Sequence, residues 1–142
     1  MKTKMLTLVA LITGLLVTSS ALVAHHGAAA FDMSKPVVLK DAMITQLVWI
    51  NPHPLIKADY KDEKGEVQHW TMEMGSTVSS QLIGWSRTTL HFGDVVTLYV
   101  WQAKTHAPVG RFNKVILPDG STMRDTQTGA DDGGRADTDV GR

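Results

Sequence analysis

The chain has 142 residues, with 14 basic and 14 acidic side chains, six histidines and no cysteine. This balanced charge provides no basic field for nucleic acid, so nucleic-acid partners are excluded. Without cysteine the chain has no disulfides, no thiolate chemistry and no lipobox lipidation, so its fold must depend on a core.

The first 24 residues have the pattern of an export signal. Lys2 and Lys4 form a basic start, and residues 5–17 are uncharged and mostly apolar. Residues 18–24 are uncharged and mostly small, as cleavage by signal peptidase requires. Residues 1–24 are therefore predicted to be a signal peptide. Export of a cysteine-free chain fits a bacterial periplasm.

The cleavage site decides which residue begins the exported chain. A cut after Ala24 leaves 118 of the 142 residues, a slightly acidic chain that starts at His25 and has no membrane segment. A cut after Ala21 satisfies the small-x-small rule better. Residues 5–24 are also just long enough to span a bilayer uncleaved, although the polar break at 18–20 argues against an anchor.

The exported part divides into an arm, one domain and a tail. Residues 25–35 are predicted to form an extended arm, and the ring of Phe31 would pin it to the body. Residues 36–123 carry strand patterns and form the predicted domain. Residues 124–142 are rich in aspartate and glycine and contain one branched aliphatic side chain, which predicts a disordered acidic tail.

Five strands and one short helix are expected inside the domain. The strand segments are 37–50, 55–61, 66–74, 95–102 and 112–117, with a further short strand near 121–123. Two prolines within 51–54 must break the first strand, because proline cannot donate to a ladder. The helix covers 77–83, with Ser76 or Thr77 as its cap and Gly84 as its end.

Three strands, a helix and then two strands is the order of an OB-type barrel. The predicted fold class is therefore all-β: a small OB-like five-stranded barrel with one short helix between strands three and four. Full closure removes the sheet edges, which favours this barrel over the alternative, a small open β-sandwich.

A paired histidine opens the predicted exported chain and makes metal binding the first functional hypothesis. His25 would offer an amine and a ring nitrogen, His26 adds a second ring, and His53 is held on a rigid turn framed by prolines. His91 or His106 could join them. These donors favour copper first, then zinc or nickel. The alternative is that His53 only caps its turn and that the pair merely neighbours the cleavage site.

A second candidate is a soft-metal site on the third strand. Alternation places Trp70, Met72 and Met74 on one face of that strand. Thioethers select Cu(I), and an indole face stabilises a cation. The competing interpretation is that these side chains fill the barrel interior, as alternating apolar residues usually do.

Six short motifs stand out in order along residues 24–124. They are Ala24-His25-His26-Gly27, Phe31-Asp32, Trp49-Ile50-Asn51-Pro52-His53, Trp70-Thr71-Met72-Glu73, Gly84-Trp85 and Leu90-His91-Phe92-Gly93-Asp94-Val95-Val96-Thr97. Together they resemble a family of small exported proteobacterial proteins catalogued as domain of unknown function 6152. This resemblance implies export and a single domain, and it implies no established activity.

The segment Trp70-Thr71-Met72-Glu73-Met74 is also similar to the metal-binding strand of periplasmic copper/silver efflux chaperones with an OB-type barrel. That resemblance implies Cu(I) held by Met72 and Met74 beside the Trp70 ring. Here Trp70 stands two residues before Met72 rather than three, and the chaperones' histidine has no clear match.

These observations predict an exported periplasmic protein that binds a metal ion, most readily copper, without catalysis. No nucleophile elbow, paired carboxylates or phosphate-cradling glycine loop indicates an enzyme. The alternative is an accessory module that docks on a membrane or a periplasmic protein partner and binds no metal.

Overall fold

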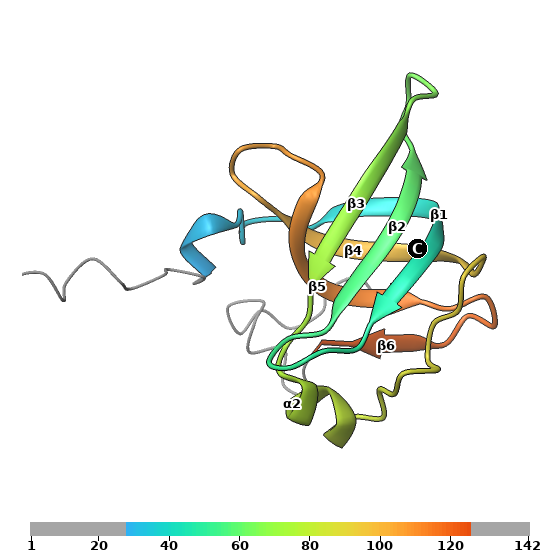
Figure 1. Cartoon of the computed structure of the whole chain (residues 1–142). Helices are drawn as coiled ribbons and strands as arrows, with labels where there is room; N and C mark the ends of the chain where they lie inside the picture. The colour runs from blue at the N-terminus through green and yellow to red at the C-terminus, as the bar shows by residue number, and fades with distance from the viewer. Residues whose placement is uncertain (1–27, 126–142) are drawn as a thin grey trace, which may run out of the picture.

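The computed structural model describes residues 28–125 (Figure 1). In chain order its elements are η2 (Ala28–Ala30), β1 (Val37–Val48), β2 (Leu55–Lys61), β3 (Val67–Glu73), α2 (Thr77–Leu82), β4 (Val95–Gln102), β5 (Val109–Ile116) and β6 (Thr122–Arg124). The predicted signal peptide, His25, His26 and residues 126–142 of the predicted tail lie outside the described residues. Within 28–125, no helix is long and apolar enough to cross a membrane.

The strands close into a barrel. Neighbours follow the order β3-β2-β1-β4-β5-β6, and an additional pairing joins β3 to β5. In this closing pair, which we call the seam, residues 71–73 run parallel to residues 109–111. The other pairs are antiparallel. The prediction of an all-β, OB-like five-stranded barrel with one helix between strands three and four is confirmed, and the open sandwich is wrong.

One long strand serves two neighbours because it bends. The pairing of β1 with β4 covers residues 37–43, whereas its pairing with β2 begins only at residue 43 and covers 43–48. The register shifts between Leu39 and Ala42, where Asp41 has a φ of 57°. A bulge with a left-handed residue bends a strand in this way. The start of β1 therefore diverges from β2, and we call that end of the barrel the mouth.

Inward-facing side chains of all five barrel strands form the core. Trp70, Met72 and Met74 lie on the inward face of β3, as the alternation predicts. Trp85 packs edge-on against Phe112, with ring centroids 5.4 Å apart. Other fully buried members come from each remaining strand and include Leu39, Ile44, Ile56, Leu98, Val100 and Val115.

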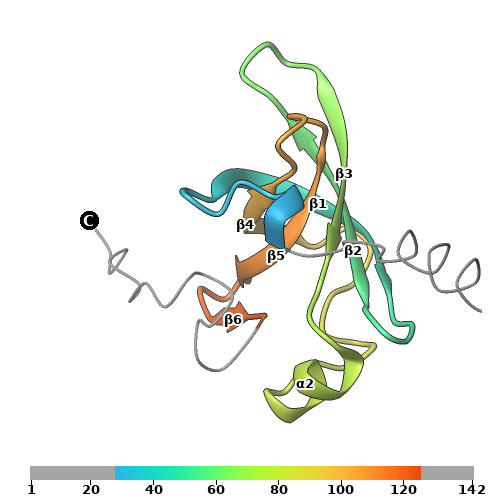
Figure 2. The same ribbon diagram turned by 90° about the vertical axis from the view of Figure 1, so that its left-hand side faces the viewer.

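Helix α2 lies at the end of the barrel opposite the β2–β3 hairpin, as both views show (Figures 1 and 2). Ser76 is its N-cap and accepts a hydrogen bond from the backbone of Ser79, so the predicted cap is confirmed. Thr77 donates through its backbone N to the carbonyl of Pro52 and through its hydroxyl to the carbonyl of Ile50. These bonds fasten the β1–β2 connection to the helix.

Strand β5 begins at Val109, three residues before the predicted start at residue 112. Pro108 and Gly110 made this segment resemble a loop. The chain needs Gly110 for a different reason: a Cβ there would collide with Val100 Cγ1 and would lie 2.6 Å from the Trp101 carbonyl oxygen. A glycine inside a strand allows such a close approach between neighbouring backbones.

The end of the described chain is tied to the barrel. Asp125 is 2% exposed, its carboxylate accepts from the backbone N of Gly75, and it pairs with Arg111 at 3.4 Å. The indole of Trp85 donates to the carbonyl of Arg124 at 2.7 Å. The domain therefore extends to Asp125, two residues beyond the predicted boundary at residue 123.

We expect Gly110→Ala to destabilise the barrel by about 1–3 kcal/mol, because the added methyl group overpacks the contact with β4. Urea denaturation followed by tryptophan fluorescence measures the change in the free energy of unfolding. Val109→Ala, an exposed neighbour on the same strand, is the control and should cost about 0.5 kcal/mol or less. Equal stability of Gly110→Ala and the parent chain would contradict this packing.

Candidate functional site

Of His25, His26 and His53, the described residues include His53, which lies on the β1–β2 connection. Its Nδ1 is 3.1 Å from the carbonyl oxygen of Met74 and 3.8 Å from Oε1 of Glu73. A carbonyl oxygen only accepts, so Nδ1 is the donor here, and in the neutral ring Nε2 is the nitrogen that carries the lone pair. The side chain is 39% exposed. The ring is thus fixed on one side and open to solvent on the other.

The remaining described histidines are dispersed over the surface. His69 contacts Asp59 at 2.7 Å across the β2–β3 ladder. His91 belongs to the turn before β4, where its backbone N donates to Asp94. His106 lies in the β4–β5 loop with a φ of 61°. Among residues 28–125, no three His, Asp or Glu side chains come together as a ready-made metal site.

The soft-metal candidates lie inside the barrel. Met72 and Met74 are fully buried, and Trp70 is 5% exposed. All three pack in the hydrophobic core. A metal at these thioethers would have to enter a packed interior, so the structure gives the two methionines a core role that needs no metal.

The arm is held against the β4–β5 loop. Phe31 forms a β-bridge with Ala103, the backbone N of Asp32 donates to Gln102 at 2.8 Å, and Lys104 donates to Ala30 at 3.1 Å. The predicted contact of the arm with the body is therefore present, though the backbone of Phe31 makes it. The arm continues from the start of β1 and leads away from the barrel at the mouth (Figure 1).

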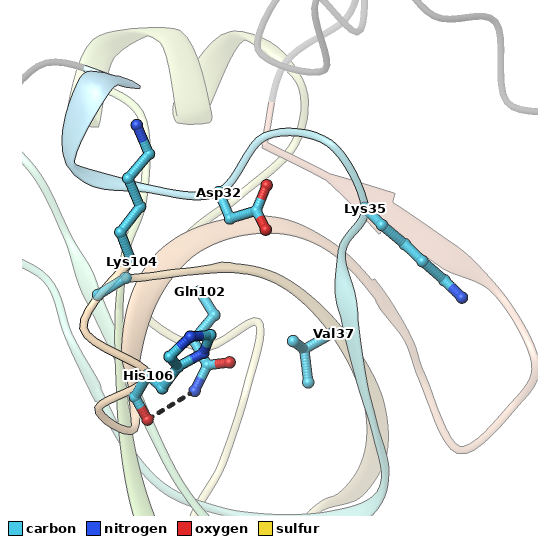
Figure 3. A pocket seen from close by; sticks show the side chains of 7 residues that line it. Asp32, Lys35, Val37, Gln102, Lys104 and His106 are labelled. Carbon is cyan, nitrogen blue, oxygen red and sulfur yellow. Dashed lines mark hydrogen bonds between the residues drawn. The ribbon is translucent and has the colours of Figure 1, made fainter.

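This contact leaves a groove of about 530 Å³ between the arm and the loop. Figure 3 shows Lys104 and Lys35 on its two sides, with Asp32 between them and His106 below. Hydrogen bonds from the Ser34 side chain and backbone lower the pKa of Asp32, and Lys104 and His106 add to this. Asp32 is therefore anionic at neutral pH, and Ser34 holds its carboxylate.

A second hollow, of about 300 Å³, lies in the mouth and shares Val37, Gln102 and His106 with the arm groove. We call it the mouth cleft. It lies where the start of β1 diverges from the β2–β3 hairpin, and its lining includes Leu39, Tyr60, Asp62, Gln68, Trp70 and Pro108. Four separate elements contribute, so the cleft exists only in the folded barrel.

Two amide side chains in the mouth cleft have fixed orientations. Gln102 donates through Nε2 to the carbonyls of His106 (3.0 Å) and Ala107 (3.1 Å), and Figure 3 shows the first of these bonds. Gln68 donates through Nε2 to Oδ2 of Asp62 at 3.2 Å. Because these partners can only accept, each amide nitrogen is identified and each Oε1 is left as an acceptor.

Sequence reasoning did not find the mouth cleft. Gln68 and Gln102 belong to no motif, and 34 positions separate them along the chain. One local signal was available: Asp62 opens the predicted 62–65 turn, and its carboxylate accepts from the backbones of Lys64 and Glu66 as well as from Gln68.

The pKa of Asp62 provides a test of this hairpin. The backbone hydrogen bond from Glu66, followed by Gln68 and Lys64, lowers that pKa below the usual 3.8. A carboxyl group with a lowered folded pKa stabilises the fold above its unfolded pKa and loses this contribution as pH falls through the folded value. The wild-type chain should therefore be more stable than Asp62→Asn at neutral pH, with no difference in strong acid.

Urea denaturation at neutral pH and near pH 2 measures this difference. Glu63→Gln, in the same turn and without a side-chain hydrogen bond in the described structure, is the matched control and should show no pH-dependent gap. A gap for Asp62→Asn that is equally large at both pH values would contradict the role of the carboxylate.

Comparison with known proteins identifies one family. The model of a family of unknown function (DUF6152) matches residues 12–111, which is most of the chain. The chain therefore belongs to this family. No curated protein and no solved structure matches it, and the similarity to copper/silver chaperones stays a prediction.

Proposed function

We propose that this member of the DUF6152 family is an exported, periplasmic metal-binding protein without catalytic activity. Copper is the first candidate metal, with zinc or nickel next, and His25, His26 and His53 are the proposed ligands. The observation that carries the proposal is the way the His53 ring is held.

A histidine that binds metal usually donates its other ring N–H to a carbonyl or carboxylate. His53 does this through Nδ1 to the carbonyl of Met74, with the Glu73 carboxylate at 3.8 Å. The lone pair of Nε2 therefore points away from these partners on a half-exposed ring. Such a ring can bind a metal without rearranging, and the nearby carboxylate favours a cation.

The proposed ligands meet only if the arm is extended. Phe31 pairs with Ala103, Ala103 neighbours Val109, and Val109 pairs with Thr71, so three interstrand spacings, roughly 14 Å, separate Phe31 from β3. Four residues lie between His26 and Phe31, and three of them form the 3-10 helix η2, which rises only about 2 Å per residue. The proposed ligand set therefore requires η2 to unwind, so that the extended arm reaches past Thr71 to the end of β3, where Met74 holds His53.

His106 is the alternative third imidazole. It lies two residues after Lys104, whose backbone donates to Ala30 in the arm. Its ring thus starts nearer to the arm than that of His53, but no carbonyl or carboxylate in the described structure fixes it. The fixed orientation of its ring favours His53 as the third ligand, whereas the shorter distance to the arm favours His106.

One observation favours the alternative function, an accessory protein that binds no metal. Val78 and Leu82 on α2 are 66% and 78% exposed, and Ile50 on the neighbouring connection is 48% exposed. Exposed apolar side chains gathered at one end of a small domain are typical of a protein contact. Protein purified from the periplasm without any bound metal would support this alternative.

Copper titration of the exported protein tests the metal proposal. Intact mass and Cu(II) electron paramagnetic resonance should report one tightly bound equivalent with nitrogen ligands. We expect His25→Ala and His53→Ala each to weaken binding at least tenfold, because each removes one ligand of a chelate. N-terminal sequencing should find His25 as the first residue.

His69→Ala is the matched control, since His69 is also an exposed histidine but pairs with Asp59 on the outer face. It should leave copper binding unchanged. Unchanged binding in both His25→Ala and His53→Ala would end the histidine proposal, and loss in His106→Ala instead would move the third ligand to the loop. Binding of Cu(I) alone, removed by Met72→Leu with Met74→Leu, would favour the soft-metal site.

A further inference from the structure

The mouth cleft has the features of a site for a ligand other than a metal. We propose that it binds a small neutral polyol, such as a mono- or disaccharide. The proposal rests on the cleft's size, on its two oriented amide oxygens and on its charge, and it is independent of the histidine site.

The size of the cleft suits a ligand of one or two sugar rings. Its volume of about 300 Å³ is at the lower end of the usual range for small-molecule pockets, about 300–1,000 Å³. The arm groove, which shares Val37, Gln102 and His106 with it, offers room for a second ring.

The amides of Gln68 and Gln102 present acceptors. Both hydrogens of Gln102 Nε2 are used by the carbonyls of His106 and Ala107, and Gln68 Nε2 is held by Asp62. Neither Oε1 has a hydrogen-bond donor within residues 28–125. Two fixed acceptors select a ligand that carries several donors, and sugar hydroxyls are such donors.

The wall of the cleft adds an unsatisfied donor and apolar surface. Trp70 lines the cleft, and its buried Nε1–H has no acceptor in the described part of the chain. A buried indole N–H normally finds a partner, and a ligand hydroxyl oxygen reaches this one if the Trp70 ring shifts toward the cleft. Val37, Leu39 and Tyr60 provide a surface for the C–H face of a sugar ring.

Charge selects a neutral ligand. Lys35 and Lys104 line the adjoining groove and would repel an organic cation. Asp32 in the same groove and Asp62 in the mouth cleft have lowered pKa values and are anionic at neutral pH, so they offset the two lysines. The charges balance, and neither an organic anion nor an organic cation is favoured over a neutral ligand.

Nuclear magnetic resonance of the metal-free exported protein tests this proposal. Glucose, N-acetylglucosamine and maltose are titrated to about 20 mM, enough to saturate a site with a Kd near 1 mM. At least one of them should shift the indole N–H signal of Trp70 in a saturable manner. The indole of Trp49, which does not line the cleft, should stay unchanged.

Variants locate the binding. Gln68→Met and Gln102→Met should each raise the Kd about tenfold, as expected for the loss of one hydrogen bond to the ligand. Gln81→Met, on the exposed face of α2, is the matched control and should bind like the parent. If Gln102→Met loosens its loop, Gln68→Met on β3 still provides the test.

Three outcomes would overturn the proposal. The first is that none of the three sugars shifts the Trp70 signal. The second is that the shift survives in both folded glutamine variants. The third is that choline or acetate binds more tightly than every sugar. Because no metal is present, failure here would leave the copper proposal untouched, and failure of copper binding would leave this one untouched.

Discussion

The short parallel seam between β3 and β5 is the constraint on which the rest of the structure depends. Three residues on each strand close the barrel, residues 71–73 against 109–111. Without the seam, β3 and β5 would both present unpaired backbone groups, and the core side chains between them would face water. Gly110 belongs to the seam and at the same time packs so closely on β4 that any side chain there would collide with Val100 and Trp101.

Both candidate sites follow from the seam. Directly after Glu73, the last seam residue on β3, the carbonyl of Met74 holds His53, and the carboxylate of Glu73 lies nearby. Arg111, the last seam residue on β5, pairs with the buried Asp125, which also accepts from Gly75 just after β3. At the other end, the chain enters β5 from the loop that carries His106, and the bend of β1 at Asp41 leaves the mouth open. The pairing of β3 with β5 therefore positions the residues of both candidate sites, His53 at one end of the barrel and the mouth cleft at the other.

Local patterns predicted most of the fold. Alternation assigned Trp70, Met72 and Met74 to one face, and the structure places them in the core. The bounds of β4 were predicted from alternation, and of the two predicted caps, Ser76 and Thr77, Ser76 is the one that caps the helix. The start of β5 was missed because Pro108 and Gly110 resemble a loop, whereas Gly110 pairs with Gln102 of β4 and with Met72 of β3, 38 positions earlier. The mouth cleft was missed because Gln68 and Gln102 lie far apart in the sequence and line one hollow only after the barrel closes. His25 and His26 remain a hypothesis drawn from the sequence.

Native-state hydrogen exchange at the amide of Thr71 tests closure most directly. This amide donates across the seam to the carbonyl of Pro108 at 3.1 Å. If the barrel is closed, Thr71 exchanges as slowly as the amide of Ile44, which lies between β1 and the turn before β4 and donates to Asp94 at 2.8 Å. Exchange of Thr71 at the rate of an exposed edge strand, with Ile44 still protected, would contradict a closed barrel and with it the arrangement of both sites.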